Sequence, residues 1–434
     1  MEMEVSQQFT EYLEHLAQGL GHKDRRAGLR DYCTGLMQTL GKKNAQSMAQ
    51  RFETADAVAR HQALHHFVSR ATWSDEEILR RVAQWVVPRI DFDSGGWWTI
   101  GYTEYIKYGG HSVGVARQRC VVSGKRENCQ VAVNVSLACE HGSLPLAWRL
   151  YLPQVWADDE TRRMKVGVPA EIQFATKTQI ALQQIEGLLS DGRVRYPVLA
   201  DVGCGMDAAF RQGLSDLGLQ YMVGITSDVL VWHSGADESN SVPGKSADHR
   251  HLQPQDGVTN RLVSVKAVAK ALPGDALQTV RWSEGGGVER IGRFAAVRVR
   301  QASGYSCWSR LQAPQWLLLQ WPPGEPEPTG YWLSTLPESM QVDQLVAATH
   351  YVGRVEKDHQ TLKRDFGLDH YEGRGWRGFH HHAVLCIASY GFALAEGFAA
   401  RRAVLEPVNC MHREPERFQW PIHAERGAHE SNTT

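Results

Sequence analysis

The chain has 434 residues, too many for one ordinary hydrophobic core, so we expect two or three domains or a core with a large insertion. Hydrophobic residues make up 42% of the chain, which is ample for a globular protein. The formal net charge of −1 gives no overall indication of nucleic-acid binding, so any nucleic acid would have to bind to local basic patches. The eight cysteines form no CxxC pair and the first residues lack a signal-peptide pattern, which argues against a zinc ribbon or disulfide framework and favours the cytoplasm.

Residues 1–92 are predicted to form a helical domain. Apolar residues recur at helical spacing from Phe9 to Leu20, and Ser74 followed by three acidic residues is typical of a helix start. Basic clusters at residues 22–26 and 80–81 could hold a DNA backbone, although solvated helix faces have the same composition. DNA binding by this domain is therefore left open.

Residues 93–227 are predicted to form the first part of a mixed α/β core. Apolar or alternating runs indicate strands, Gly142-Ser143 supplies a hairpin turn, and amphipathic stretches indicate helices. The predicted strands are residues 97–100, 130–138, 144–152, 197–201 and 219–225, and the predicted helices are residues 178–189 and a segment from about 207. This order of elements is that of a mixed sheet flanked by helices.

The rest of the chain is predicted to contain an insertion and a helical end. Residues 228–336 form a mainly β insertion, with strands at 294–300, 316–321 and 331–336. Residues 337–413 form a C-terminal helical part of the core, and residues 414–434 a flexible tail. The apolar run 383–400 contains Ser389 and Glu396, so we expect a buried core helix and no membrane span.

One helix is predicted within residues 350–366, where apolar residues at three-and-four spacing line one face. Glu356 and Lys363 share the flank beside that face, and Gly367 suits the helix end. A surface helix with a solvated charged face would have the same pattern.

Asp201 is the last residue of the buried strand predicted at 197–201. A carboxylate there faces the crevice in which α/β folds collect ligands, although an aspartate after a strand is also often a helix N-cap. Asp201 and Glu356, joined by a third carboxylate, could hold two Mg²⁺ ions for in-line attack at a phosphodiester.

Several ordered segments between about residues 95 and 395 match a known family pattern. They are HSVGVARQ (111–118), NCQVAV (128–133), SLPLAWRLYLP (143–153), WADD (156–159), VLAD (198–201), WPPGEPEP (321–328), YWLST (331–335) and GLDHYEGRGWRGFHHH (367–382). Through them the chain resembles the DDE-type transposases of bacterial insertion sequences, in which a β-strand insertion interrupts an RNase H-like catalytic core.

The resemblance implies metal-dependent cleavage and transfer of DNA strands at element ends, with Mg²⁺ or Mn²⁺ bound by three acids. Asp201 matches the second acid. Glu356 matches the third, because the late helix of the family carries Glu followed seven residues later by Lys, as Glu356 and Lys363 are here. That lysine would contact a DNA phosphate near the cut. Glu372 is the alternative third acid.

The position of the first acid is occupied by glycine. Relatives carry Asp ten residues ahead of the histidine of the HSVGV motif, and here this position is Gly101. Thr103 and Lys107 still match the family, which argues against a shift of alignment. Glu104 could substitute, with Asp91 and Asp93 as weaker alternatives. We interpret the chain as an insertion-sequence transposase, and the alternative is a transposase-derived DNA-binding protein that Gly101 has made inactive.

Basic residues near the proposed acids could form the groove for DNA. They are Lys107, Arg117, Arg119, Lys125, Arg126, Lys363, Arg374 and Arg377. His380, His381 and His382 are consecutive on a helix and point in different directions, so we expect no shared metal ion. The expected partners are double-stranded DNA at the element ends, target DNA, and a second copy of the chain in a synaptic homodimer.

Overall fold

The structure is a computed structural model that describes residues 2–38, 41–51, 57–90, 95–120, 123–234, 260–284, 288–302 and 313–405. Asp91, Asp93 and the predicted tail at 414–434 lie outside the described residues.

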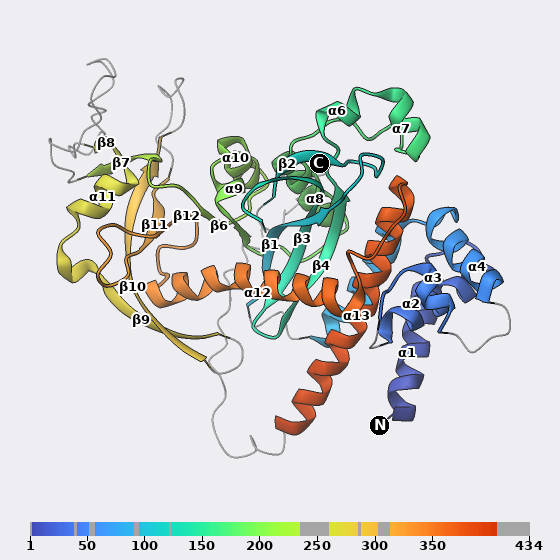
Figure 1. The fold of residues 1–434 in the computed structure, drawn as a ribbon. Helices are drawn as coiled ribbons and strands as arrows, with labels where there is room; N and C mark the ends of the chain where they lie inside the picture. Colours follow the sequence, from blue (N-terminus) through green and yellow to red (C-terminus); the bar gives the residue numbers. More distant parts are fainter. Residues whose placement is uncertain are drawn as a thin grey trace, which may run out of the picture.

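Five strands at the centre of the molecule form one part of a larger mixed sheet (Figure 1). These strands lie in the order β4-β3-β1-β5-β6, in which β5 pairs parallel with both β1 and β6 and the other pairs are antiparallel. Their bounds are β1 (Trp97–Ile106), β3 (Arg126–Cys139), β4 (Gly142–Leu150), β5 (Val198–Ala200) and β6 (Tyr221–Gly224). The mixed, RNase H-like sheet predicted from the sequence is confirmed.

Helices cover both faces of this sheet. On one face lies α8 (Lys177–Ser190), which starts with a capping box made by Thr176 and Gln179 and reaches β3 through a 3.0 Å hydrogen bond from Gln184 Nε2 to Val133 O. The opposite face is crossed by α12 (Val342–Phe366), which ends at Gly367 in the left-handed conformation (φ 70°). The predicted amphipathic helix is therefore confirmed, and it begins eight residues earlier than predicted.

The N-terminal helices pack around the long C-terminal helix α13 (Trp376–Leu405) (Figure 1). Tyr12 donates a 2.9 Å hydrogen bond to Ala388 O, and the rings of Trp73 and His381 stack with centroids 3.4 Å apart. The Ser74 cap is present, since its side chain accepts from Glu77 N. These helices are α1 (Glu2–Ala17), α2 (Arg25–Met37), α3 (Ala45–Ala49), α4 (Ala57–Ser69), α5 (Asp75–Val86) and the 3₁₀ turn η1 (Val87–Arg89).

In the described part of the chain, α13 supplies the one stretch, residues 376–399, that is long and apolar enough to cross a membrane. Most of it is buried among the other helices, with Leu385, Cys386 and Ile387 wholly inaccessible. This burial agrees with the core helix expected from the sequence.

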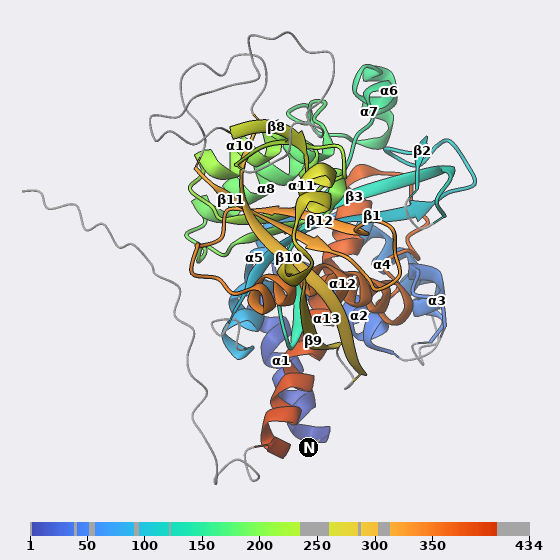
Figure 2. The same cartoon turned by 90° about the vertical axis from the view of Figure 1, so that its left-hand side faces the viewer.

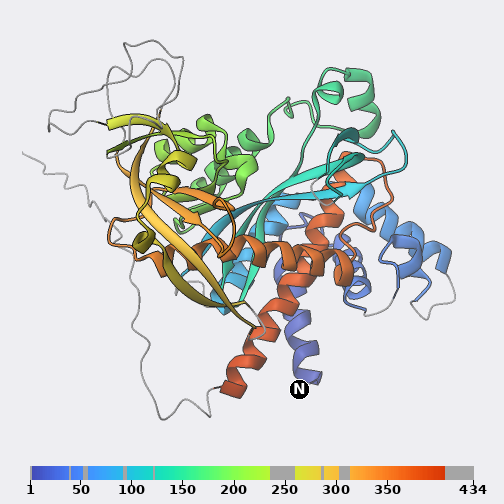
Figure 3. The ribbon, with the colours of Figure 1, turned by 60° about the vertical axis from the view of Figure 1, so that its left-hand side comes forward.

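The insertion continues the central sheet. Strand β12 pairs antiparallel with β6, and the order then runs through β11, β10, β7 and β8. Figures 2 and 3 show these yellow and orange strands beside the beginning of α12, which contacts β9 and β10. Bounds are β7 (Leu230–Ser234), β8 (Asn260–Ser264), α11 (Val265–Ala271), η4 (Gly274–Ala276), β9 (Gln278–Glu284), β10 (Val288–Gln301), β11 (Gln315–Gln320) and β12 (Gly330–Ser334). The predicted domain boundaries stay predictions.

Short elements complete the fold around the sheet. Strand β2 was not foreseen, because its four residues are polar or small and extend the edge of β3. The bounds are β2 (Ala116–Arg119), α6 (Gln154–Ala157), α7 (Glu160–Val166), α9 (Val202–Gly205) and α10 (Ala208–Asp216).

Candidate active site

Asp201 lies directly after β5, at the C-terminal end of the parallel strands. Its backbone is still extended (φ −74°, ψ −179°), its side chain is exposed, and Oδ1 accepts a 3.2 Å hydrogen bond from Cys204 N. Asp201 is therefore the N-cap of α9 as well as a carboxylate at the end of a strand. A capping bond holds the carboxylate in place and leaves it accessible.

Gly101 and Asp201 occupy adjacent positions on neighbouring strands. Trp98 pairs with Val198 and Thr99 with Leu199, so continuing this parallel register places Gly101 level with Asp201. Leu199 packs in the apolar cluster that includes Leu345 of α12. Because side chains alternate along an extended strand, both Gly101 and Asp201 belong to the face that α12 covers. The two positions that the resemblance assigns to the first and second acids therefore lie side by side.

The orientation of α12 directs Glu356 toward the same end of the sheet. Lys363 Nζ donates a 2.8 Å hydrogen bond to Glu104 O, near the C-terminal end of β1. On the other flank, Asp358 Oδ2 accepts a 2.7 Å bond from Ser143 Oγ, at the opposite end of the sheet. Glu356 is two turns before Lys363 and shares its flank, and it is exposed. This placement supports Glu356 as the partner of Asp201.

A buried polar cluster lies beneath α12 beside Gly101. Asn134 on β3 pairs directly with Gly101, is fully buried, and donates from Nδ2 to Gly101 O at 3.0 Å and to Thr103 Oγ1 at 3.4 Å. Thr103 Oγ1 lies 3.3 Å from Nδ1 of the buried His359, and burial lowers the pKa of His359 to about 4. Sequence reasoning overlooked Asn134, although an asparagine within the alternating apolar run 131–138 is a signal of a special position.

Glu104 does not reach this cluster. It neighbours Thr103 on β1, so its side chain points to the opposite face of the sheet. There it is buried, and Oε2 accepts a 2.8 Å bond from Cys120 Sγ. Burial lowers the pKa of Lys177 at the start of α8, and Glu104 is the strongest of the charges that oppose this shift. The geometry argues against Glu104 as a replacement for the missing first acid.

Glu372 is engaged with the N-terminal helices. It forms an ion pair with Lys42, and its Oε2 accepts a 3.1 Å bond from Asn44 Nδ2. Lys42 Nζ also donates a hydrogen bond to Glu372 Oε1, and this bond lowers the pKa of Glu372. These contacts give Glu372 a structural role in joining the 367–375 segment to the N-terminal part of the chain, and they favour Glu356 as the third acid.

The three consecutive histidines are core residues. All are buried, and each ring contacts backbone groups: His380 Nε2 accepts from Leu150 N, His381 lies between Val68 O and Trp73 O, and His382 contacts Gly367 O. They diverge along α13 as expected. Within the residues that the structure describes, no group of three or more His, Cys, Asp or Glu side chains could hold a metal ion.

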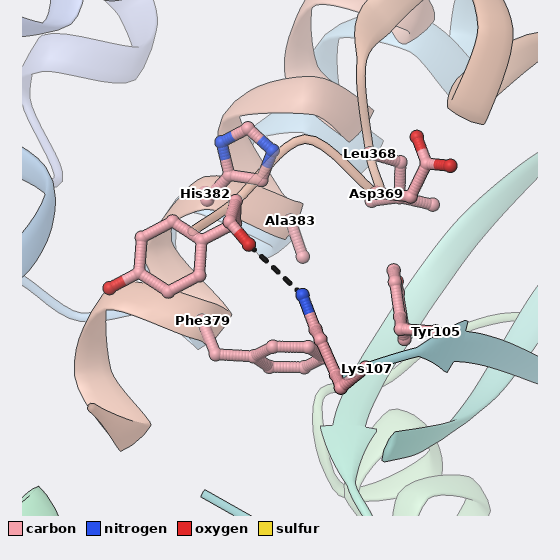
Figure 4. Close-up of a pocket in the computed structure, with 8 residues that line it drawn as sticks. Tyr105, Lys107, Leu368, Asp369, Phe379, His382 and Ala383 are labelled. Carbon is pink, nitrogen blue, oxygen red and sulfur yellow. Dashed lines mark hydrogen bonds between the residues drawn. The ribbon is translucent and has the colours of Figure 1, made fainter. Parts of the chain in front are cut away.

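Two of the three lysines predicted to contact DNA, Lys107 and Lys363, form hydrogen bonds within the protein. Lys107 enters a small pocket between β1 and the segment before α13, where Nζ donates to Tyr371 O at 3.1 Å (Figure 4). Lys363 bonds to Glu104 O, and burial lowers the pKa of both lysines. Each must exchange a carbonyl partner to reach a phosphate. Arg117, Arg374 and Arg377 are exposed.

The strand order, with acids at the end of β5 and on a late helix across the sheet, is that of an RNase H-like core. A family model described as DDE superfamily endonuclease matches residues 15–287, more than half of the chain. The chain therefore belongs to the DDE superfamily endonucleases and is a DDE-type transposase-like protein. The match includes Gly101 and Asp201 and ends before α12. No curated protein matches the chain.

Nucleases of this superfamily act on DNA and generally use divalent metal ions. The donor set here fits that chemistry incompletely. Asp201 and Glu356 have carboxylate oxygens of the kind that Mg²⁺ prefers, whereas Gly101 has no side-chain ligand. The polar neighbour of Gly101, Asn134, is fully buried beneath α12. A site for two ions, which needs carboxylates that position both, does not fit these residues.

Proposed function

We propose that this protein is a transposase-derived protein that binds double-stranded DNA at insertion-sequence ends without cutting it. The observation that supports the proposal most strongly is at Gly101. This residue lies level with Asp201 on the α12 face, where it can supply no ligand, and the nearest acid along β1, Glu104, points to the other face. Loss of one of three acids removes the arrangement on which two-ion cleavage depends.

DNA would be held by the positive side chains around this end of the sheet. Arg374 and Arg377, before and at the start of α13, and Arg117 on β2 are exposed and can bind phosphates. We expect the protein to act as a homodimer that brings two DNA ends together, in the cytoplasm, where bacterial DNA lies.

An active transposase is the second candidate. Asp201 and Glu356 are both exposed, and the flank of α12 directs Glu356 to the end of the sheet at which Asp201 lies. These two carboxylates could hold one Mg²⁺ or Mn²⁺ ion. Under this hypothesis the protein would cleave and transfer DNA strands at the element ends with an incomplete set of acids.

Binding and cleavage can be measured on the same DNA. The probe is the pair of sequences that flank the gene of this protein, as labelled duplexes for binding and on a supercoiled plasmid for cleavage with Mg²⁺ or Mn²⁺. We expect binding that weakens steeply with salt and no nicked or linear plasmid. Nicking by the native protein that is lost in Asp201→Asn would refute the inactive-binder proposal and support the second candidate.

A further inference from the structure

Asn134 occupies the space that a side chain at position 101 would need. A Cβ built on Gly101 would lie 2.8 Å from Asn134 Oδ1 and 3.2 Å from Nδ2. Contacts below 3.0 Å require one of the two groups to move. Gly101 and Asn134 are direct partners in the antiparallel pair of β1 and β3, so this overlap follows from the register of the sheet.

Asn134 has little freedom to move away. Its Nδ2 group donates to Gly101 O and Thr103 Oγ1, and its Oδ1 accepts from Ser136 Oγ at 3.3 Å. The side chain is fully buried between the sheet and α12. Turning it aside would break these bonds in a place that water does not reach, so the groups would be left without partners.

An aspartate at position 101 would meet a second obstacle. Its Cβ would lie closer to the acceptor Oδ1 of Asn134 than to the donor Nδ2, and a carboxylate and an amide oxygen are both acceptors with no proton to share. Placing a carboxylate beside an acceptor oxygen at this half-buried position of β1 is unfavourable. Position 101 thus lacks an acid, and the space that an acid would need there is occupied by Asn134, whose Oδ1 is a hydrogen-bond acceptor.

We propose that the side chain of Asn134 fills the space that an acid at position 101 would need, so that the residues at positions 101 and 134 depend on each other. An acid at position 101 completes a metal site with Asp201 and Glu356 only when residue 134 is made smaller. This inference rests on the proposed function, because it takes Gly101 to be the missing ligand position. On this proposal, Gly101→Asp alone is not sufficient to restore the site.

The test is a double-mutant cycle in the full-length protein: native, Gly101→Asp, Asn134→Ser and the double variant. Thermal unfolding and calorimetric titration with Mn²⁺ are measured for each. Gly101→Asp alone is expected to lower the melting temperature and gain little Mn²⁺ affinity. The double variant should recover much of the lost stability and bind Mn²⁺ roughly tenfold or more tightly than Gly101→Asp.

A matched control adds the same charge where there is room. Gly109 lies just beyond β1 and is exposed, and a Cβ there would meet nothing within 4 Å. Gly109→Asp should combine additively with Asn134→Ser in melting temperature. This control separates the effect of the steric pair from that of an added acid.

The proposal is overturned if the effects of Gly101→Asp and Asn134→Ser on melting temperature are additive, or if the double variant gains no Mn²⁺ affinity over Gly101→Asp. These outcomes differ from failure of the proposed function. Cleavage by the native protein would refute the inactive-binder proposal without changing the stability coupling. Additive stability changes would refute the pairing and leave DNA binding without cleavage intact.

Discussion

Gly205 closes the short helix that follows Asp201, and replacing it by alanine should disrupt this end of the sheet. A Cβ on Gly205 would lie 1.8 Å from Gly224 O, a backbone atom of β6 that cannot rotate away. Gly224 is constrained less severely, since its own Cβ would lie 3.0 Å from Val202 N. Helix α9 therefore packs backbone to backbone on β6, and the absence of a side chain at Gly205 allows this close approach.

The size of the effect follows from the distances. A carbon and an oxygen need about 3.3 Å between them, so α9 and β6 would have to separate by about 1.5 Å. Forced overpacking costs about 3 kcal/mol or more when backbone must shift. The matched control is Gly187→Ala in α8, where a Cβ meets nothing within 4 Å. That change should stabilise the protein by about 0.5–1 kcal/mol.

The assay is urea-induced unfolding followed by tryptophan fluorescence, combined with amide hydrogen exchange to locate the damage. Gly205→Ala should lower the unfolding midpoint and speed exchange in α9 and β6, whereas Gly187→Ala should raise the midpoint slightly. Equal stability of Gly205→Ala and the native protein would refute the close backbone packing.

Three further predictions concern the same region. Burial lowers the pKa of His359 to about 4, so the contribution of this neutral histidine to the free energy of unfolding is complete above pH 6.5. This contribution should decrease by about 2 kcal/mol as the pH falls from 7 to 5. His359→Gln should reduce this pH dependence. Arg374→Ala should lower the slope of log K against log salt for DNA by about one, whereas Arg89→Ala, an exposed arginine stacked on Trp85, should not. In the double variant described above, Glu356→Gln should abolish the gained Mn²⁺ affinity and Glu372→Gln should retain it.

Specific outcomes would contradict each of these expectations. An unchanged pH profile of unfolding in His359→Gln would mean that this histidine is not neutral and buried. An equal salt slope for Arg374→Ala and the native protein would remove Arg374 from the DNA surface. Retention of Mn²⁺ affinity in Glu356→Gln, with loss in Glu372→Gln, would exchange the two candidates for the third acid.

The local patterns of the chain were sufficient to predict the elements of the core. The alternation of Val131, Val133 and Val135 marks β3, and the spacing of Val355, Leu362 and Phe366 marks α12. These patterns are strong because each element buries one apolar face. Strand β2 and much of the insertion have no such pattern, since their stability depends on the strands beside which they lie.

The candidate site was only partly predictable. Asp201, Gly101 and Glu356 could be named from motifs, because each falls at a fixed place relative to a strand or helix. Asn134 could not be connected to Gly101, because their contact depends on how β1 and β3 pair across 33 residues of chain. Likewise, the alternation of Thr103 and Glu104 is visible in the sequence, but which face α12 covers is decided by tertiary packing.

The pairing of β12 with β6 has a mechanical consequence for any DNA that the protein holds. Backbone hydrogen bonds join the insertion to the strand next to β5, so the insertion cannot pivot on a flexible tether. For a duplex that touches both the insertion and the end of β5, the distance between these two contact regions would be fixed by the protein. The length of DNA protected from digestion should then be constant, whatever its sequence.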